Sequence, residues 1–132
     1  MICARIESLI LERGMEDALT RAFAFVEAGA DAIMPHSRSE EPSEIFEFIE
    51  KFRSRDKSTC LVVVPTSYNS VTEEEFKSRG VNVVIYANHL MRAAVPAIQG
   101  AAVNILEHHR AHECDTMLMP FRDIIRLIPA EN

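Results

Sequence analysis

The chain has 132 residues, of which 48% are hydrophobic and 26% are charged, and its formal net charge is −6. These values are typical of one globular domain. The negative charge argues against binding to nucleic acid or to an anionic membrane, because phosphates attract clusters of Lys and Arg. No apolar run approaches the ~20 residues of a membrane span, and the opening residues show no signal-peptide pattern. Three unpatterned cysteines favour reduced thiols, so we expect a cytoplasmic protein.

The first half of the chain alternates between short apolar runs and amphipathic segments. Leu19, Ala22, Phe23 and Val26 have helical spacing, and Gly29 follows where a left-handed cap is expected. A second apolar stripe follows Pro42, a residue favoured in a first helical turn. The expected elements are a strand from Ile2, a helix over Glu16–Ala28, a strand over Ala32–Met34 and a helix that begins near Pro42.

The second half continues the alternation. The continuous apolar run Cys60–Val64 is typical of a strand covered on both faces. Thr72 and Glu75 fit a capping box that opens a brief helix ending at Gly80. The remaining expected elements are a strand over Val81–Tyr86, a helix over Leu90–His109 that Pro96 should kink or delay, and a final helix over Pro120–Ile128.

Strands that alternate with helices predict an α/β fold with parallel strands and crossover helices. Such folds carry their chemistry at the carboxyl ends of the strands. The four predicted ends all bear polar or reactive side chains, which packing alone does not explain. They are Arg5 with Glu7, His36 with Ser37, Pro65 with Thr66, and Asn88 with His89.

The first two strand ends have both a functional and a structural interpretation. Arg5 offers a permanently charged fork for a carboxylate or phosphate, or it forms an ion pair with Glu7. Glu7 shares a strand face with Arg5 and is expected to orient it rather than act as an acid. His36 suits donation to a developing anion or proton transfer, although a single strand-end histidine is more often structural.

The other candidates have simpler explanations. Ser37 suits donation to an anion or capping of a turn, and Asn88 is explained by capping the long helix. His108 and His112 lie four residues apart, but no carboxylate-plus-histidine signature completes a metal site. A solvated helix end is the better interpretation, because histidine there suits the helix dipole.

Several segments together are similar to the phosphoenolpyruvate mutase family of the isocitrate lyase superfamily. They are ARIES, GMEDALTRAFAFVEAGADAIMPHS, VVVPTSY, VNVVIYANHLMRAAVPAIQ and the terminal MPFRDIIRLIP, in order over nearly the whole chain. The Arg-Ile-Glu triplet is discriminating, because the carbon–carbon lyases of the superfamily usually carry Arg-Thr-Asp. Phosphonopyruvate hydrolase shares the Arg-x-Glu form and is the nearest competitor.

This resemblance implies a (β/α)₈ barrel that interconverts phosphoenolpyruvate and phosphonopyruvate with Mg²⁺, the reaction that forms the C–P bond in phosphonate biosynthesis. Phosphoryl transfer of this kind needs positive charge and tight positioning more than an acid or base. Arg5 matches the phosphoryl-binding arginine of the family, and His36 matches a strand-end histidine that donates to the migrating group. Ser37, Glu7 and Asn88 are left with supporting or structural roles.

The resemblance also implies that the chain contains only part of such an enzyme. Four strand–helix units are half of a barrel, which needs roughly 250 residues. The metal-binding carboxylates and the gating loop belong to the first half of the barrel, and no Mg²⁺ ligands are identified here. We therefore expect residues 1–132 to form a single partial barrel domain, the C-terminal half, that is inactive alone.

Three explanations of a half-barrel remain open, since open strand edges and an unfilled interior invite association. The chain is the C-terminal part of a longer enzyme, it joins a separately encoded half, or it dimerises as an inactive protein that binds only oxyanions. By analogy with the family, a homo-oligomer is also expected. The sequence does not separate mutase from hydrolase, because the gating loop is absent from it.

Overall fold

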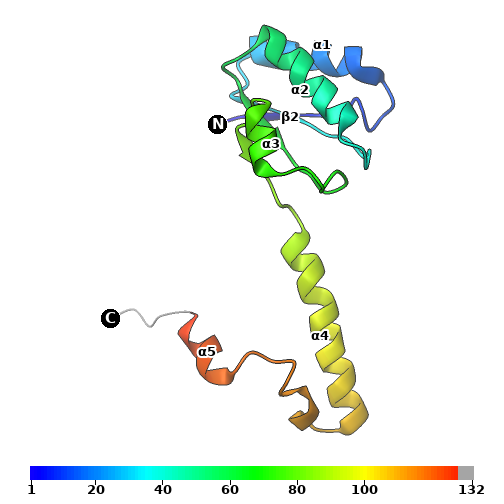
Figure 1. Cartoon of the computed structure of the whole chain (residues 1–132), viewed down its shortest axis with the longest axis vertical. Helices are drawn as coiled ribbons and strands as arrows, with labels where there is room; N and C mark the ends of the chain where they lie inside the picture. Colours follow the sequence, from blue (N-terminus) through cyan, green and yellow to red (C-terminus); the bar gives the residue numbers. More distant parts are fainter. Residues whose placement is uncertain (128–132) are drawn as a thin grey trace. The chain divides into compact units, whose positions relative to one another are not determined.

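The computed structural model describes residues 1–127, which are drawn in colour in Figure 1. The chain forms two compact units, Met1–Ala87 and Asn88–Asn132. None of the helices in the described residues is long and apolar enough to cross a membrane.

The first unit contains one parallel sheet whose four strands lie side by side in chain order. Helices alternate with the strands, so the predicted α/β fold with crossover helices is confirmed. The elements are β1 (Cys3–Ile6), α1 (Gly14–Glu27), β2 (Ala32–Pro35), α2 (Ser43–Arg55), β3 (Cys60–Val63), α3 (Glu73–Ser78) and β4 (Val83–Val84).

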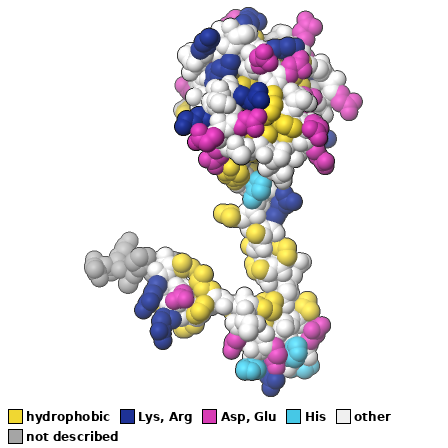
Figure 2. Space-filling view, in the orientation of Figure 1, with side chains coloured by type: hydrophobic (Ala, Val, Ile, Leu, Met, Phe, Trp, Pro, Cys, Tyr) yellow, Lys and Arg dark blue, Asp and Glu magenta, His cyan; other side chains and the backbone are white. Residues whose placement is uncertain are grey.

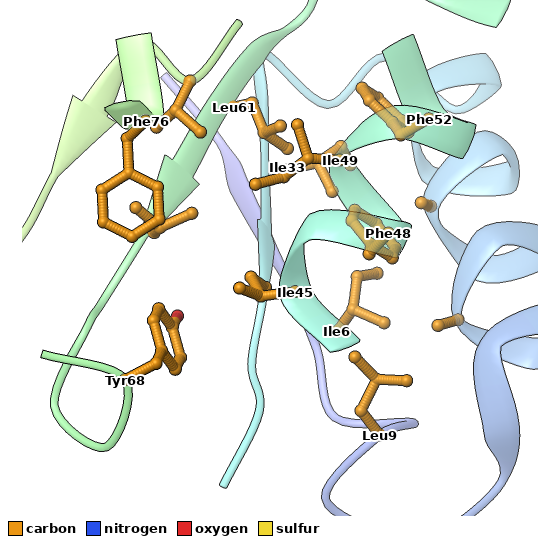
Figure 3. Close-up of a cluster of buried hydrophobic side chains, with 14 of the residues drawn as sticks. Ile6, Leu9, Ile33, Ile45, Phe48, Ile49, Phe52, Leu61, Tyr68 and Phe76 are labelled. Atoms are coloured by element: carbon orange, nitrogen blue, oxygen red, sulfur yellow. The ribbon is translucent and has the colours of Figure 1, made fainter. Parts of the chain in front are cut away.

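The hydrophobic core lies between one face of this sheet and its helices. The stripe predicted on α2 is fully buried there (Figure 3) and consists of Ile45, Phe48, Ile49 and Phe52. Ile6, Ile33 and Leu61 supply the strand side of the same cluster. Successive strand residues point to opposite faces, so Arg5 projects from the face opposite Ile6. The core thus fixes the strand that carries the first candidate residue.

Thr72 caps α3 as predicted, because its Oγ1 accepts a hydrogen bond from the backbone N–H of Glu75 at 3.2 Å. The Glu75 carboxylate, the other half of the predicted box, accepts from Arg79 Nη2 at 3.1 Å instead. The strand predicted over Val81–Tyr86 is shorter, with only Val83–Val84 in ladder geometry. Its ends still bond to β3, since Asn82 N donates to Leu61 O and Ile85 N to Val63 O, both at 2.9 Å. The apolar run therefore marks the strand correctly but overstates its length.

Arg53, near the end of α2, ties three segments of the first unit together. Its guanidinium donates to Gly80 O at 2.9 and 2.8 Å, to Thr59 O at 2.9 Å and to Asp56 O at 3.1 Å. It also donates to Asn82 Oδ1 at 2.8 Å. One side chain thus fixes the loops that lead into β3 and β4.

The second unit contains α4 (His89–His108), the 3₁₀ turn η1 (His112–Cys114) and α5 (Phe121–Arg126). Pro96 lies inside α4 and does not delay its start. The helix ends at His109, which adopts the left-handed conformation with φ of 52°. Ile128, the predicted end of the last helix, lies outside the described residues. Apolar side chains along α4 and α5 are exposed (Figure 2), among them Leu90, Ile98 and Phe121.

Candidate functional site

The carboxyl end of β1 places Arg5 and Glu7 on one face of the sheet, as the alternation of the strand predicts. Arg5 Nε donates a hydrogen bond to Glu7 Oε1, and the two charges form an ion pair. The side chains are 48% and 40% exposed, so the pair is open to solvent rather than buried. Arg5 also lines a surface hollow together with Arg13 and Arg21. The guanidinium is therefore accessible to a small anion.

His36 follows β2 and brings a third functional group to the same place. Its backbone N–H donates to Ile6 O at 3.0 Å, which continues the pairing of β1 with β2. Its ring nitrogen Nδ1 contacts Arg5 Nη2 and lies 3.4 Å from Glu7 Oε1. Because a guanidinium can only donate, Nδ1 accepts and the proton of the neutral ring is assigned to Nε2. The predicted neighbourhood of Arg5, Glu7 and His36 is thus present in the structure.

Two donor groups in this cluster remain available for a ligand. Within the described residues, the Nη1 group of Arg5 makes no hydrogen bond, and neither does Nε2 of His36. Both groups carry N–H donors. The arrangement can therefore bind an oxyanion by two kinds of donor from adjacent strands.

The pKa of Glu7 is lowered from its ordinary value of 4.5. Burial acts in the opposite direction, but the hydrogen bond and the positive charge of Arg5 outweigh it. A lowered folded-state pKa means that the ionised carboxyl stabilises the fold above its unfolded-state pKa. That contribution is lost as the pH falls through the lower folded-state value.

We therefore expect Glu7→Gln to flatten the acid-induced loss of stability below about pH 4.5. The measurement is urea unfolding of the chain at a series of pH values from about 3 to about 6. Glu16→Gln, which removes the same charge from an exposed position in α1, is the control. An unchanged pH dependence in Glu7→Gln would show that the ion pair contributes nothing to stability.

Ser37 is placed differently from the residues that face the hollow. It is only 3% exposed, and its hydroxyl donates to a carboxylate oxygen of Glu44 in the first turn of α2. Ser37 Oγ in turn accepts a hydrogen bond from the backbone N–H of Ser39 at 3.0 Å. Both capacities of the hydroxyl are thus used within the protein, which favours the turn-capping alternative.

The third strand end forms a tight turn, and Asn88 lies in the second unit. Thr66 N donates to Val64 O at 2.8 Å in a tight turn after β3. Asn88 belongs to the second unit, where it is the N-cap residue of α4. Its side chain makes no capping hydrogen bond, and its backbone oxygen accepts from Arg92 N at 2.9 Å.

The residues around Arg5 do not form a site for Mg²⁺. Divalent magnesium prefers several oxygen ligands in octahedral geometry. The one carboxylate in the cluster, Glu7, is engaged by Arg5, and no group of three His, Cys, Asp or Glu residues in the described part of the chain could hold a metal. The chemistry of this cluster is therefore that of N–H donors and positive charge.

Ser8, Asp17 and Glu44 support the cluster, and the sequence patterns did not single them out. Ser8 is 2% exposed and donates to Asp17 Oδ2 at 2.6 Å. Asp17 also accepts from Arg21 Nε at 2.8 Å. Each carboxylate lies in the first turn of the helix that follows a candidate strand end, where acidic residues are common for electrostatic reasons, so the position alone did not indicate a role.

The family of the chain follows from comparison with known proteins. The family model for phosphoenolpyruvate phosphomutase matches residues 1–106. The chain belongs to this family. Its fold is that of the C-terminal half of a (β/α)₈ barrel, as the sequence predicted. The crystal structure of phosphoenolpyruvate phosphomutase from Streptomyces platensis subsp. rosaceus superimposes with a TM-score of 0.88 and 32% identity, over 96% of this chain and 43% of that one.

Curated relatives carry two different names. The phosphoenolpyruvate phosphomutase of Tetrahymena pyriformis is 40% identical over 126 residues, which are 96% of this chain and 41% of the relative. The phosphonopyruvate hydrolase of Variovorax sp. is 38% identical over 128 residues, 96% of this chain and 43% of the relative. A crystal structure of phosphonopyruvate hydrolase with oxalate and Mg²⁺ superimposes with a TM-score of 0.86. The chain spans about two fifths of the length of these relatives.

Proposed function

We propose that the chain supplies the phosphoryl-binding part of a phosphoenolpyruvate mutase site, which interconverts phosphoenolpyruvate and phosphonopyruvate. The observation that carries this proposal is the contact between Arg5 and His36 at adjacent strand ends, with one N–H group of each left for a ligand. Family membership and similarity to phosphomutases over 96% of the chain support it.

The reaction moves a phosphoryl group between oxygen and carbon of one pyruvate enolate. In the synthetic direction the P–O bond of phosphoenolpyruvate breaks and a P–C bond forms, so no atom or electron is gained or lost. Charge on the three equatorial oxygens must be balanced while the group migrates. Arg5 Nη1 supplies permanent positive charge and His36 Nε2–H supplies a neutral donor. Neither residue has to gain or lose a proton in this step.

The remaining residues have supporting roles in the proposal. Glu7 holds Arg5 in register with His36, Ser37 shapes the turn after β2, and Asn88 begins α4. Residues 1–132 act as one partial barrel domain of a cytoplasmic enzyme. The Mg²⁺ that the family resemblance implies would be held by carboxylates of the other part of the barrel. That part reaches the site from the same polypeptide or from a separate chain, whereas a homo-oligomer of this chain alone would only bind oxyanions.

Phosphonopyruvate hydrolase is the second candidate, because a hydrolase relative is 38% identical over the same region. Both reactions use phosphonopyruvate and both require donors around the phosphoryl oxygens. They differ in the acceptor, which is the enolate oxygen in the mutase and water in the hydrolase. An inactive half-barrel that binds oxyanions is the third candidate, because the described residues hold donors but no metal site.

The test has two stages. First, ³¹P NMR of phosphonopyruvate with the purified chain is expected to show binding that Arg5→Ala abolishes. Second, the chain is purified with the part of the Tetrahymena relative outside the matched region, and the products from phosphonopyruvate with Mg²⁺ are identified. Phosphoenolpyruvate supports the mutase, and pyruvate with inorganic phosphate supports the hydrolase. A stable complex without turnover favours the inactive half-barrel. Each component alone is the control.

A further inference from the structure

The same arrangement occurs after two adjacent strands of the sheet. After β1, Glu7 is followed by the buried Ser8, and after β2, His36 is followed by the buried Ser37. Each serine donates a hydrogen bond to an acidic side chain in the first turn of the next helix. Both serines are buried, Ser8 at 2% and Ser37 at 3% exposure.

The first of these connections closes the loop between β1 and α1. Ser8 Oγ donates to Asp17 Oδ2 at 2.6 Å, and Arg21 Nε holds the same oxygen at 2.8 Å. The backbone of the loop folds back on itself, because Arg13 N donates to Ser8 O at 2.9 Å and Leu11 N to Glu7 O at 3.0 Å. The backbone carbonyl groups of Glu7 and Ser8 are therefore both held by hydrogen bonds within the loop.

The second connection fixes the turn after β2. Ser37 donates to Glu44 and accepts from Ser39 N, while the backbone N–H of His36 bonds to β1. Glu44 stands one residue inside α2, whose apolar stripe is anchored in the core. Hydrogen bonds to a carboxylate are stronger than those between neutral groups, and the serine end of each bond is buried. The position of His36 is thus coupled to a rigid helix.

We propose that Asp17 and Glu44 are positioning residues, each of which holds a site residue in place through a buried serine. The proposal rests on the proposed function in treating Arg5, Glu7 and His36 as the site. The carboxylates touch neither the reacting groups nor a ligand. They restrict the backbone one residue after Glu7 and His36, so that both side chains stay against the guanidinium of Arg5. Preorganisation of this kind lets donors stabilise charge without reorganising during the reaction.

The test uses carboxyl titration of Glu7 by ¹³C NMR in the full chain, because the lowered pKa of Glu7 depends on Arg5 remaining in place, and Arg5 is held against His36. The variants are Asp17→Asn and Glu44→Gln. Glu16→Gln and Glu47→Gln are the matched controls, since each removes an exposed acidic residue from the same helix. Ser8→Ala and Ser37→Ala break the same two hydrogen bonds and leave all charges in place. Thermal unfolding is followed for every variant.

The expected direction separates positioning from a plain charge effect. Removal of a nearby negative charge alone lowers the pKa of a carboxyl group. Loss of positioning raises the pKa of Glu7 toward 4.5, because Arg5, whose Nη2 group contacts His36, no longer holds the ionised form of Glu7. We expect the rise in both acid variants and in both serine variants, and not in the controls. A lowered or unchanged pKa of Glu7 in the folded serine variants would overturn the proposal.

A second measurement keeps this proposal apart from the proposed function. Binding of inorganic phosphate to the chain is expected to weaken several-fold in Ser37→Ala and Glu44→Gln, and to be unchanged in Glu47→Gln. The titration of Glu7 needs no substrate and no catalysis. If the titration behaves as expected while the mutase assay fails, positioning stands and the proposed reaction falls. If turnover is found while the pKa of Glu7 is unchanged in the serine and acid variants, the proposed reaction stands and the positioning proposal falls.

Discussion

Replacing Arg5 with alanine is expected to lower kcat/KM for phosphonopyruvate by about 10²- to 10³-fold in the completed enzyme. Arg5 is the permanent positive charge of the cluster, and His36 is oriented by its Nη2 group. Removing the guanidinium therefore removes one donor to the phosphoryl group and also frees His36, the second donor, to move. His36→Ala is expected to lower kcat/KM by a similar factor, because it removes the neutral donor. The measurement is steady-state kinetics of the assembly described above.

Three comparisons make this expectation specific. Arg5→Lys keeps the charge but loses the planar fork that contacts Glu7 and His36 together, so it should recover only part of the activity. Arg13→Ala removes a positive charge from the same hollow, at a residue whose side chain makes no capping bond to α1. It should stay within a few-fold of the unmodified chain. Turnover of Arg5→Ala equal to that of the unmodified chain would contradict the proposed role.

The fold of the first unit could be predicted because the period of its apolar residues is unambiguous. Ile45, Phe48, Ile49 and Phe52 repeat at helical spacing, and all four are buried. Strand lengths were harder to predict, as β4 shows. The apolar run over residues 81–86 reflects the environment of the segment, whereas ladder geometry depends on how far β3 extends beside it. Composition alone does not determine how far β3 extends beside β4.

The candidate site was predictable to the level of strand ends but not to that of hydrogen bonds. Alternation along β1 places Arg5 and Glu7 on one face, and parallel pairing brings His36 beside them. The role of Ser37 depended on whether its hydroxyl points outward or toward α2, and residue order does not determine this. The structure shows it bonded to Glu44. Charged residues in a first helical turn are common for electrostatic reasons, so Asp17 and Glu44 gave no distinct signal.

The largest expected effect on stability is that of Arg53→Ala, which should lower the free energy of unfolding by about 3 kcal/mol. The Arg53 side chain is 14% exposed, and its guanidinium donates to carbonyl oxygens of Gly80, Thr59 and Asp56. Truncation leaves these acceptors in a part-buried setting without their partner, and such groups are costly when unpaired. The loops before β3 and β4 then lose their shared anchor. Urea unfolding followed by circular dichroism measures the change.

Arg53→Lys should lose most of the same stability, because a single ammonium group cannot span acceptors in two loops as the five-donor guanidinium does. Lys51→Ala is the control, since Lys51 lies on the same helix, is exposed and pairs only with Glu47 in the described chain. Its cost should be about 0.3–0.5 kcal/mol. A double-mutant cycle with Asn82→Ala isolates the bond from Arg53 to Asn82 Oδ1, an atom that also accepts from Leu61 N at 2.9 Å. Additive losses in that cycle would show that Arg53 acts on each loop separately, whereas coupled losses would establish one network that holds β3 and β4 together.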